Sequence, residues 1–302
     1  MKKNKIYYWS CDCSKNSGEG QLALLFLKKY SKNYQFENIK FKNNNISIIK
    51  KLLNYKYLTP FVGILYCWKY YFYNKNIAYI NYLPFWNFLI FLLLPPKTLI
   101  GPITGGAHFK RTNNFYLIRK YFFPLFYKIS EIIVNYRNYD LVFSTDLLKK
   151  HLGKKVIKKS IFNFVIKNFN FKKKKTKKSI DFLIYYRVHE NKISSFPYHL
   201  INHLIISGFK ISIVGDKIKN KKVTNYGFIN HSKLSKLQAK TKYTISSSEN
   251  LYSFFTLECL KNNVKILINS SDKVNIPFFK KNFLRINFKN IKKFNNVGIN
   301  KI

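Results

Sequence analysis

The chain has 302 residues and is expected to form two domains, because single hydrophobic cores seldom grow beyond roughly 250 to 300 residues. Its formal net charge of +43 comes largely from lysine that is spread along the whole chain, a composition that AT-rich codons produce. Arginine, the usual partner of phosphates and base edges, is scarce, so no nucleic-acid partner is expected. Its four cysteines are too few and scattered for a disulfide framework or a C-x-x-C metal clip, which fits a reducing, cytoplasmic setting. We expect neither a bound metal nor a cofactor.

The first residues read as the beginning of an α/β layer. A strand is predicted at Lys5–Trp9, followed by a polar turn at Ser14–Gly20 and an apolar-periodic helix at Gln21–Tyr30. Gly18 and Gly20 are candidates for close backbone approach to a ligand, although two glycines in a polar turn are more often only a turn.

The longest apolar run is Phe85–Leu94, between predicted strands at Ile77–Tyr82 and Thr98–Ile100. This run falls short of the roughly 20 residues that a transmembrane helix needs, so a buried helix is expected, with an interfacial segment as the alternative. Together with the basic surface, the run predicts peripheral attachment to an anionic membrane, at the inner face of the plasma membrane.

A glycine-rich loop is predicted at Gly101–Phe109, GPITGGAHF. Its Gly105 and Gly106 follow a predicted strand, and open α/β sheets bind ligands at the carboxyl ends of their strands. His108 lies at the end of this loop. A single histidine is more often a structural hydrogen-bonding residue than a catalytic one, and both interpretations stay open.

A lysine-rich segment divides the chain. Lys172–Lys178 holds six lysines in seven residues, which repel one another and predict an exposed linker. We therefore place a first domain at residues 1–170, a linker at 171–180 and a second domain at 181–302.

Beyond the linker, strands alternate with helices, which predicts parallel βαβ units. The predicted strands are Asp181–Tyr186, Lys210–Val214, Val223–Ile229, Lys242–Ile245 and Val264–Asn269, and the predicted helices are Pro197–Gly208 and Ser232–Lys240. No Asp-x-Asp pair occurs in the sequence, so there is no obvious carboxylate site for a divalent ion.

Two basic residues follow the first strand of the second domain. At the carboxyl end of a parallel strand, the guanidinium of Arg187 and the ammonium of Lys192 can both clamp a diphosphate. The alternative is a solvated pair in a very basic chain. Arg187 is the more informative of the two, because arginine is uncommon here.

The stretch Ser246–Asn263, SSSENLYSFFTLECLKNN, leads from a strand through a turn into a helix. Ser247, Ser248 or Asn250 is the predicted N-cap, and the free N–H groups of the helix would suit an anion. Glu258 lies among apolar residues, so we expect it to be buried with a polar partner; the alternative is a surface pair with a lysine.

In the order and spacing of these motifs, the second domain resembles the C-terminal, donor-binding domain of the retaining group 1 glycosyltransferases of the GT-B fold, a family 4-like group. The resemblance covers Asp181–Asn269. It is carried by R-x4-K at Arg187 and Lys192, by a Gly215–Asp216 strand end, by Tyr226–Phe228 before a helix, and by a segment with two glutamates.

The resemblance implies an α/β protein with two Rossmann-like domains whose parallel sheets face a central cleft. It implies metal-independent transfer of a sugar from a nucleotide-diphosphate donor to a cell-surface glycan or lipid-linked acceptor, with retention of anomeric configuration. By motif, the implied residues are Arg187, Lys192, Asn250, Leu251 and Tyr252 at the donor diphosphate, Glu258 at the ribose, Glu249 at the sugar hydroxyls, His108 beside the reacting carbon, and Gly105 and Gly106 on the acceptor side.

The spacing of the two glutamates departs from the family pattern. Eight residues separate Glu249 from Glu258, against seven in the family. One extra residue rotates a helical side chain by about 100°, so both acids can face a ligand only if the extra residue lies in the turn before the helix.

Two other functions stay open. A basic, aromatic-rich chain can hold nucleic acid through phosphate contacts and stacking, although no recognisable nucleic-acid module occurs in the sequence. The chain can also be a transferase-like protein that has lost its activity.

Overall fold

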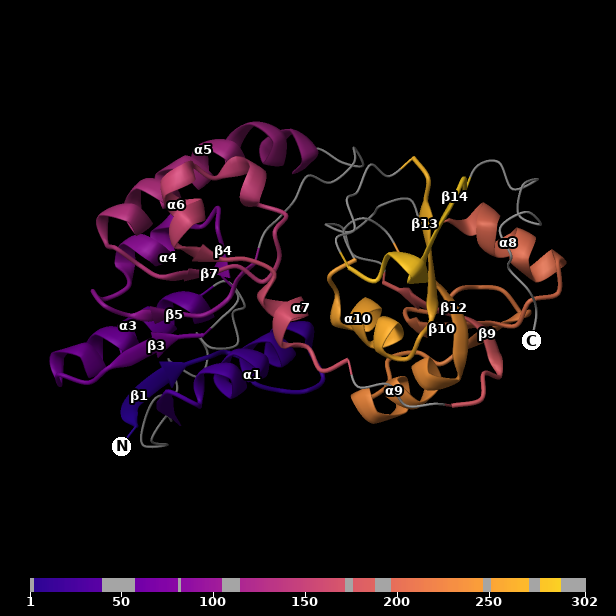
Figure 1. Ribbon diagram of the computed structural model, residues 1–302, viewed down its shortest axis with the longest axis horizontal. Helices are drawn as coiled ribbons and strands as arrows, with labels where there is room; N and C mark the ends of the chain where they lie inside the picture. Colours follow the sequence, from indigo (N-terminus) through magenta and orange to yellow (C-terminus); the bar gives the residue numbers. More distant parts are fainter. Residues whose placement is uncertain are drawn as a thin grey trace. The chain divides into compact units, whose positions relative to one another are not determined.

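The computed structural model describes residues 3–39, 58–80, 83–104, 115–171, 176–187, 197–246, 251–271 and 278–288. They form two compact units, one running from Lys3 to Asn168 and the other from Phe169 to Phe288 (Figure 1). Two aromatic side chains at the start of the second unit pack within it. The ring centroids of Phe169 and Phe254 lie 6.2 Å apart, and those of Phe171 and Phe279 lie 4.7 Å apart.

The first unit contains parallel strands, as predicted for an α/β layer. Its four-stranded sheet has the order β2-β1-β3-β5, with β1 (Asn4–Trp9), β2 (Tyr34–Asn38), β3 (Ile77–Tyr79) and β5 (Leu99–Ile100). Two further parallel pairs join β4 (Leu83–Pro84) to β6 (Ile103–Thr104) and β7 (Leu141–Val142) to β8 (Ser160–Ile161).

Helices connect these strands. They are α1 (Gly18–Tyr30), α3 (Thr59–Phe72), α4 (Phe88–Leu93), α5 (Phe115–Tyr136), the 3₁₀ turn η1 (Lys149–His151), α6 (Lys154–Lys159) and α7 (Phe164–Asn168). Helix α1 begins earlier than predicted, because the Ser17 hydroxyl caps it by accepting the N–H of Gly20 (2.8 Å). Gly18 and Gly20 therefore lie in its first turn, and a Cβ at Gly20 would collide with the carbonyl oxygen of Ser14 in the chain's own loop.

The apolar run Phe85–Leu94 forms a shorter and less buried helix than expected. Only its central part is helical, as α4, in which Ile90 and Phe91 are buried. The three leucines of α4 point outward and are 41–44% exposed: Leu89, Leu92 and Leu93. The prediction of a buried helix is thus wrong for half of α4. Among the residues described, no helix is long and apolar enough to cross a membrane.

The second unit is a six-stranded, fully parallel sheet with the order β11-β10-β9-β12-β13-β14. Its strands are β9 (Ile180–Tyr186), β10 (Ile211–Gly215), β11 (Val223–Asn225), β12 (Thr241–Ile245), β13 (Lys265–Asn269) and β14 (Phe283–Ile286), and its helices are α8 (Tyr198–Ile206), α9 (His231–Lys240) and α10 (Phe254–Lys261), with a 3₁₀ turn η3 (Lys280–Asn282). Figure 1 shows α8 on one side of the sheet and α9 and α10 on the other. Because both faces are covered, β10 is buried along its whole length and β9 from Asp181 to Ile184, and most of these residues are apolar.

One residue of the predicted linker is not exposed. Lys178 is half-buried, and its Nζ donates to the carbonyl oxygens of Ala239 (3.1 Å) and Asn262 (2.7 Å), at the C-terminal ends of α9 and α10. Burial lowers the pKa of this amine. A cation is favourable where two helices end, since their last carbonyl groups lack intrahelical partners. The prediction of an exposed segment is therefore wrong for Lys178, whereas Lys177 is exposed.

Replacing Lys178 by methionine is expected to lower the free energy of unfolding of the second unit by about 2 kcal/mol, because two charge-assisted hydrogen bonds to helix ends are lost. The matched change Lys177→Met should cost less than about 0.5 kcal/mol. Alkylation of the buried Cys259 during urea unfolding reports the second unit, and that of the buried Cys67 reports the first. Equal midpoints for the two variants would contradict this assignment.

Candidate functional site

The strand order of the second sheet points to one place for a ligand. Neighbouring strands β9 and β12 are the first and fourth strands of this sheet in chain order, so the chain reverses its direction of winding between them. Open α/β sheets bind ligands outside the carboxyl ends of the strands at such a switch point. Strand β9 ends at Tyr186 and β12 at Ile245, so the next residues, Arg187 and Ser246, leave the sheet there. Arg187 is exposed and Ser246 is buried.

Backbone contacts fix the carboxyl ends of β9 and β10 against each other. The N–H of Asp216 donates to the carbonyl oxygen of Tyr186 (2.9 Å), and the N–H of Gly215 donates to that of Gly227 (3.0 Å). Gly215 has a φ of +100°, and a Cβ there would collide with the Tyr186 carbonyl oxygen. Glycine at this position therefore allows β10 to lie close to Tyr186, the last residue of β9 before Arg187.

A tyrosine pair joins the end of β9 to the start of α8. The hydroxyl oxygens of Tyr186 and Tyr198 are 2.6 Å apart. This hydrogen bond, together with desolvation, raises the pKa of Tyr186 to about 12. The phenol of Tyr186 is therefore harder to deprotonate than that of an ordinary tyrosine.

Within the stretch Ser246–Asn263, the helix begins later than predicted, at Phe254. Ser253 is the N-cap of α10, and its side chain accepts the N–H of Thr256 (3.2 Å). The prediction of an N-cap among the earlier serines or Asn250 is wrong, because Ser253 makes the capping bond. Leu251 and Tyr252 are buried in the turn before the helix. The turn before the helix thus extends to Ser253. It is in this turn that the extra residue between the two glutamates was expected.

Glu258 lies in the second turn of α10 and is only 9% exposed. Its Oε1 is 2.6 Å from Nε2 of His231, the first residue of α9. The expectation of a buried acid with a polar partner is confirmed, and the alternative of a surface pair with a lysine is wrong. His231 was not predicted. Its signal in the sequence was its position at the start of the helix that follows Tyr226–Phe228.

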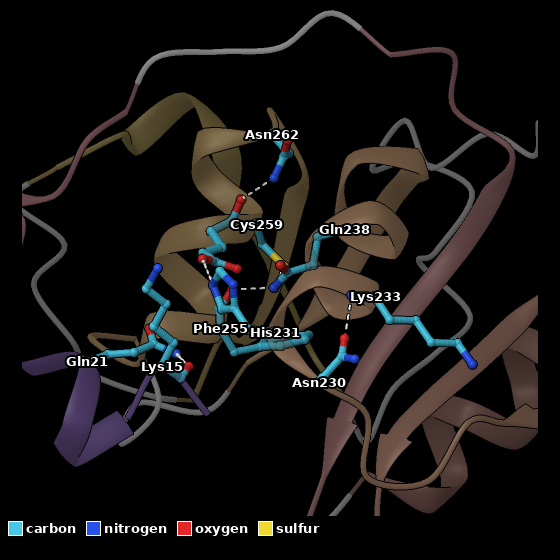
Figure 2. Close-up of polar contacts among 10 residues, drawn as sticks. Lys15, Gln21, Asn230, His231, Lys233, Gln238, Phe255, Cys259 and Asn262 are labelled. Carbon is cyan, nitrogen blue, oxygen red and sulfur yellow. Dashed lines mark hydrogen bonds and ion pairs between the residues drawn. The ribbon is translucent and has the colours of Figure 1, made fainter. Parts of the chain in front are cut away.

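Polar contacts hold α9 and α10 together around this pair (Figure 2). The amide nitrogen of Gln238 donates to the carbonyl oxygen of Phe255 (3.1 Å) and lies 3.6 Å from the sulfur of Cys259. At the end of α10 itself, the side chain of Asn262 donates to the carbonyl oxygen of Glu258 (2.8 Å). The carboxylate is therefore placed by two helices that are bonded to each other.

The first unit has its own polar cluster at the carboxyl end of β1. Ser10, Asp12 and Glu19 line a small recess there. Burial acts to raise the pKa of Asp12, but the hydroxyl of Ser17 and the N–H of Ser14 (2.7 Å) donate to the carboxylate, and the net result is a lowered pKa. Asp12 is thus a charged carboxylate that the sequence analysis missed.

Several predicted site residues lie outside the described residues, and their roles stay predictions: His108, Lys192, Glu249, Asn250, Gly105 and Gly106. Within the part of the chain that the structure describes, no three His, Cys, Asp or Glu side chains lie close enough together to hold a metal ion.

No protein-family model and no curated protein sequence matches the chain. Solved structures do match. A UDP-GlcNAc 2-epimerase from Methanocaldococcus jannaschii, in complex with UDP-GlcNAc and UDP, is 11% identical with a TM-score of 0.50, over 100% of this chain and 94% of its own. HepE from Anabaena in complex with UDP is 11% identical with a TM-score of 0.48, over 94% of this chain and 85% of its own. The heptosyltransferase WaaC from E. coli with ADP-2-deoxy-2-fluoro heptose is 10% identical with a TM-score of 0.37, over 97% of this chain and 99% of its own.

At these identities the likeness concerns the fold. The Methanocaldococcus jannaschii structure matches with a TM-score of 0.50 over the whole chain. Together with the two parallel, helix-covered sheets, it confirms the predicted fold class of two Rossmann-like units of the GT-B type.

Proposed function

We propose that the chain is a glycosyltransferase that binds a nucleotide-diphosphate sugar at the switch point of its second unit. The observation that carries the proposal is the convergence of two segments on neighbouring strands: Arg187 leaves β9, and the segment that leads to Glu258 leaves β12. One supplies a cation suited to a diphosphate and the other a carboxylate suited to hydroxyl groups. The proposed acceptor is a cell-surface glycan or a lipid-linked molecule.

Arg187 would bind the diphosphate and offset the negative charge that develops on it as the sugar leaves. A guanidinium can do this without a divalent ion, so the proposed reaction is metal-independent. Retention of the anomeric configuration is part of the proposal and rests on the resemblance in motif order.

Glu258 would accept hydrogen bonds from the ribose hydroxyls. His231 holds one of its carboxylate oxygens, Oε1, and so restricts how the carboxylate can rotate. The ribose would then meet an acceptor of defined orientation, which favours binding because less side-chain freedom is lost.

A thermal-shift panel of UDP-, ADP- and GDP-sugars tests the proposal. The UDP series comes first, because the Methanocaldococcus jannaschii protein was solved with UDP-GlcNAc and UDP. A ligand at a hundred times its Kd stabilises the native state by about 2.7 kcal/mol, so at least one series should raise the melting midpoint. Arg187→Ala should remove most of that shift, whereas Arg285→Ala, a control at an exposed arginine on β14, should keep it.

Other outcomes favour the alternatives. If no nucleotide sugar binds and a single-stranded oligonucleotide binds with a steep salt dependence, the chain is a nucleic-acid-binding protein. If a nucleotide sugar binds but is neither transferred nor hydrolysed, the chain is an inactive transferase-like protein.

A further inference from the structure

Helix α5 is apolar on two opposite sides. Its buried side, which includes Tyr127 and Val134, packs in the core of the first unit. At about 100° per residue, the outward side lies on the opposite face of the helix. It carries a stripe of large apolar residues that are 55–90% exposed: Leu117, Tyr121, Leu125, Ile132 and Tyr136. Such a stripe needs an explanation, because soluble monomers rarely leave extended apolar patches uncovered.

Two neighbouring helices continue this apolar surface. On α3, Leu65 and Phe72 are exposed at 69% and 74%, and they lie seven residues apart, on the same side of the helix. On α4, the three outward leucines described above are exposed as well. We call the outward sides of these three helices the α3–α5 face.

Hydrogen bonds hold these three helices in one layer. The indole N–H of Trp68 on α3 donates to the carbonyl oxygen of Leu93 on α4 (2.7 Å). The guanidinium of Arg137, directly after α5, donates to the carbonyl oxygen of Leu92 (2.7 Å). Helix α4 lies between the other two helices, since it contacts both α3 and α5.

The charged side chains that the structure describes as exposed on these three helices are all lysines. The three helices contain one acidic residue, Glu131. Its side chain is buried, and its carboxylate accepts the N–H of Gly153 (2.7 Å). Lys69, Lys120 and Lys128 are exposed. Lys128 also pairs with Glu131 (3.1 Å) while its side chain stays 62% exposed. Exposed leucine, phenylalanine and tyrosine among lysines are typical of surfaces that lie in a bilayer interface.

We propose that the α3–α5 face binds the surface of an anionic lipid bilayer. The leucines and aromatic rings enter the boundary between headgroups and acyl chains, and the lysines bind anionic headgroups. A second copy of the chain is the poorer occupant, because each copy has a net charge of +43 and the two would repel each other. This inference goes beyond the proposed sugar transfer and does not depend on it.

Vesicle flotation with the full-length protein tests the proposal. The protein should float with phosphatidylglycerol-containing vesicles and not with pure phosphatidylcholine vesicles at about 0.15 M salt. The double variant Leu125→Ser, Ile132→Ser should lose about tenfold or more in apparent affinity. A matched control, Ile161→Ser with Ile206→Ser, changes two exposed isoleucines elsewhere and should stay within about twofold.

Both double variants should keep the wild-type circular dichroism spectrum and melting midpoint, since all four residues are exposed. Absence of vesicle binding by the wild type overturns the proposal. So does equal loss, or no loss, in the two double variants, because binding would then follow overall charge alone. A wild-type dimer that the α5 double variant converts to a monomer, with vesicle binding unchanged, would assign the face to a second copy instead.

Discussion

Replacing Glu258 by glutamine is expected to weaken binding of a ribonucleoside diphosphate by about 10- to 100-fold, since a hydrogen bond to a charged group is worth about 1.5–3 kcal/mol. Binding of the matching 2′-deoxynucleotide should fall much less, because it lacks one of the hydroxyls that the carboxylate would accept. The preference for ribose over deoxyribose should therefore be large in the wild type and small in the variant. Isothermal titration of both nucleotides with both proteins measures the four affinities.

This comparison separates a ribose contact from a purely structural role. A structural role of Glu258 would weaken both nucleotides equally and leave the preference unchanged, which would contradict the assignment. Glu131→Gln is the matched control, because Glu131 is also a buried, hydrogen-bonded acid but lies in the first unit. It should leave both affinities unchanged. His231→Ala, which frees Oε1 of Glu258, should reduce the ribose preference by less than Glu258→Gln.

Replacing Gly215 by alanine is expected to destabilise the second unit by about 3 to 5 kcal/mol. A φ of +100° strains any residue that has a Cβ, and the added carbon would also collide with a backbone oxygen of β9 that has little room to move. The oxygen belongs to Tyr186. Because Arg187 is the next residue in the chain, binding of a diphosphate should weaken as well.

Gly227→Ala is the control for backbone strain. Gly227 has a φ of +67°, but a Cβ there would meet nothing within 4 Å, so its cost should be only about 1–2 kcal/mol. Alkylation of Cys259 in increasing urea follows the second unit, while the three tryptophans, Trp9, Trp68 and Trp86, report the first. Equal costs for the two alanine variants, or a loss confined to the tryptophan signal, would contradict the prediction.

Much of the second unit could be predicted from local sequence. Strands β9, β10, β12 and β13 were placed to within one or two residues, because β9, β10 and β13 are short, mostly apolar runs and β12 is rich in residues that favour strands. The burial of Glu258 was predicted for a similar reason, since apolar residues surround it in the helix. The polar residues before α10 hid its start, because several of them favour an N-cap and only their geometry selects Ser253.

Other features depend on residues that are far apart in the chain. The His231–Glu258 pair joins residues 27 apart, and the bond from Lys178 to Asn262 joins residues 84 apart. Strand β14 was not predicted at all. A run of lysines usually forms an exposed linker. Nothing in the neighbouring sequence therefore indicates that Lys178 is half-buried at the ends of two helices.

The sequence by itself determined that strands and helices alternate, that apolar runs form buried parallel strands, and that Arg187 lies at a strand's carboxyl end. These properties follow from neighbouring residues, because periodicity and composition set which faces of an element can be buried. Only the tertiary structure decided that β12 pairs with β9, which creates the switch point between Arg187 and Ser246. It also decided that an apolar stripe of α5 faces outward. Burial and strand pairing depend on which distant segments come together, and a local pattern does not specify that choice.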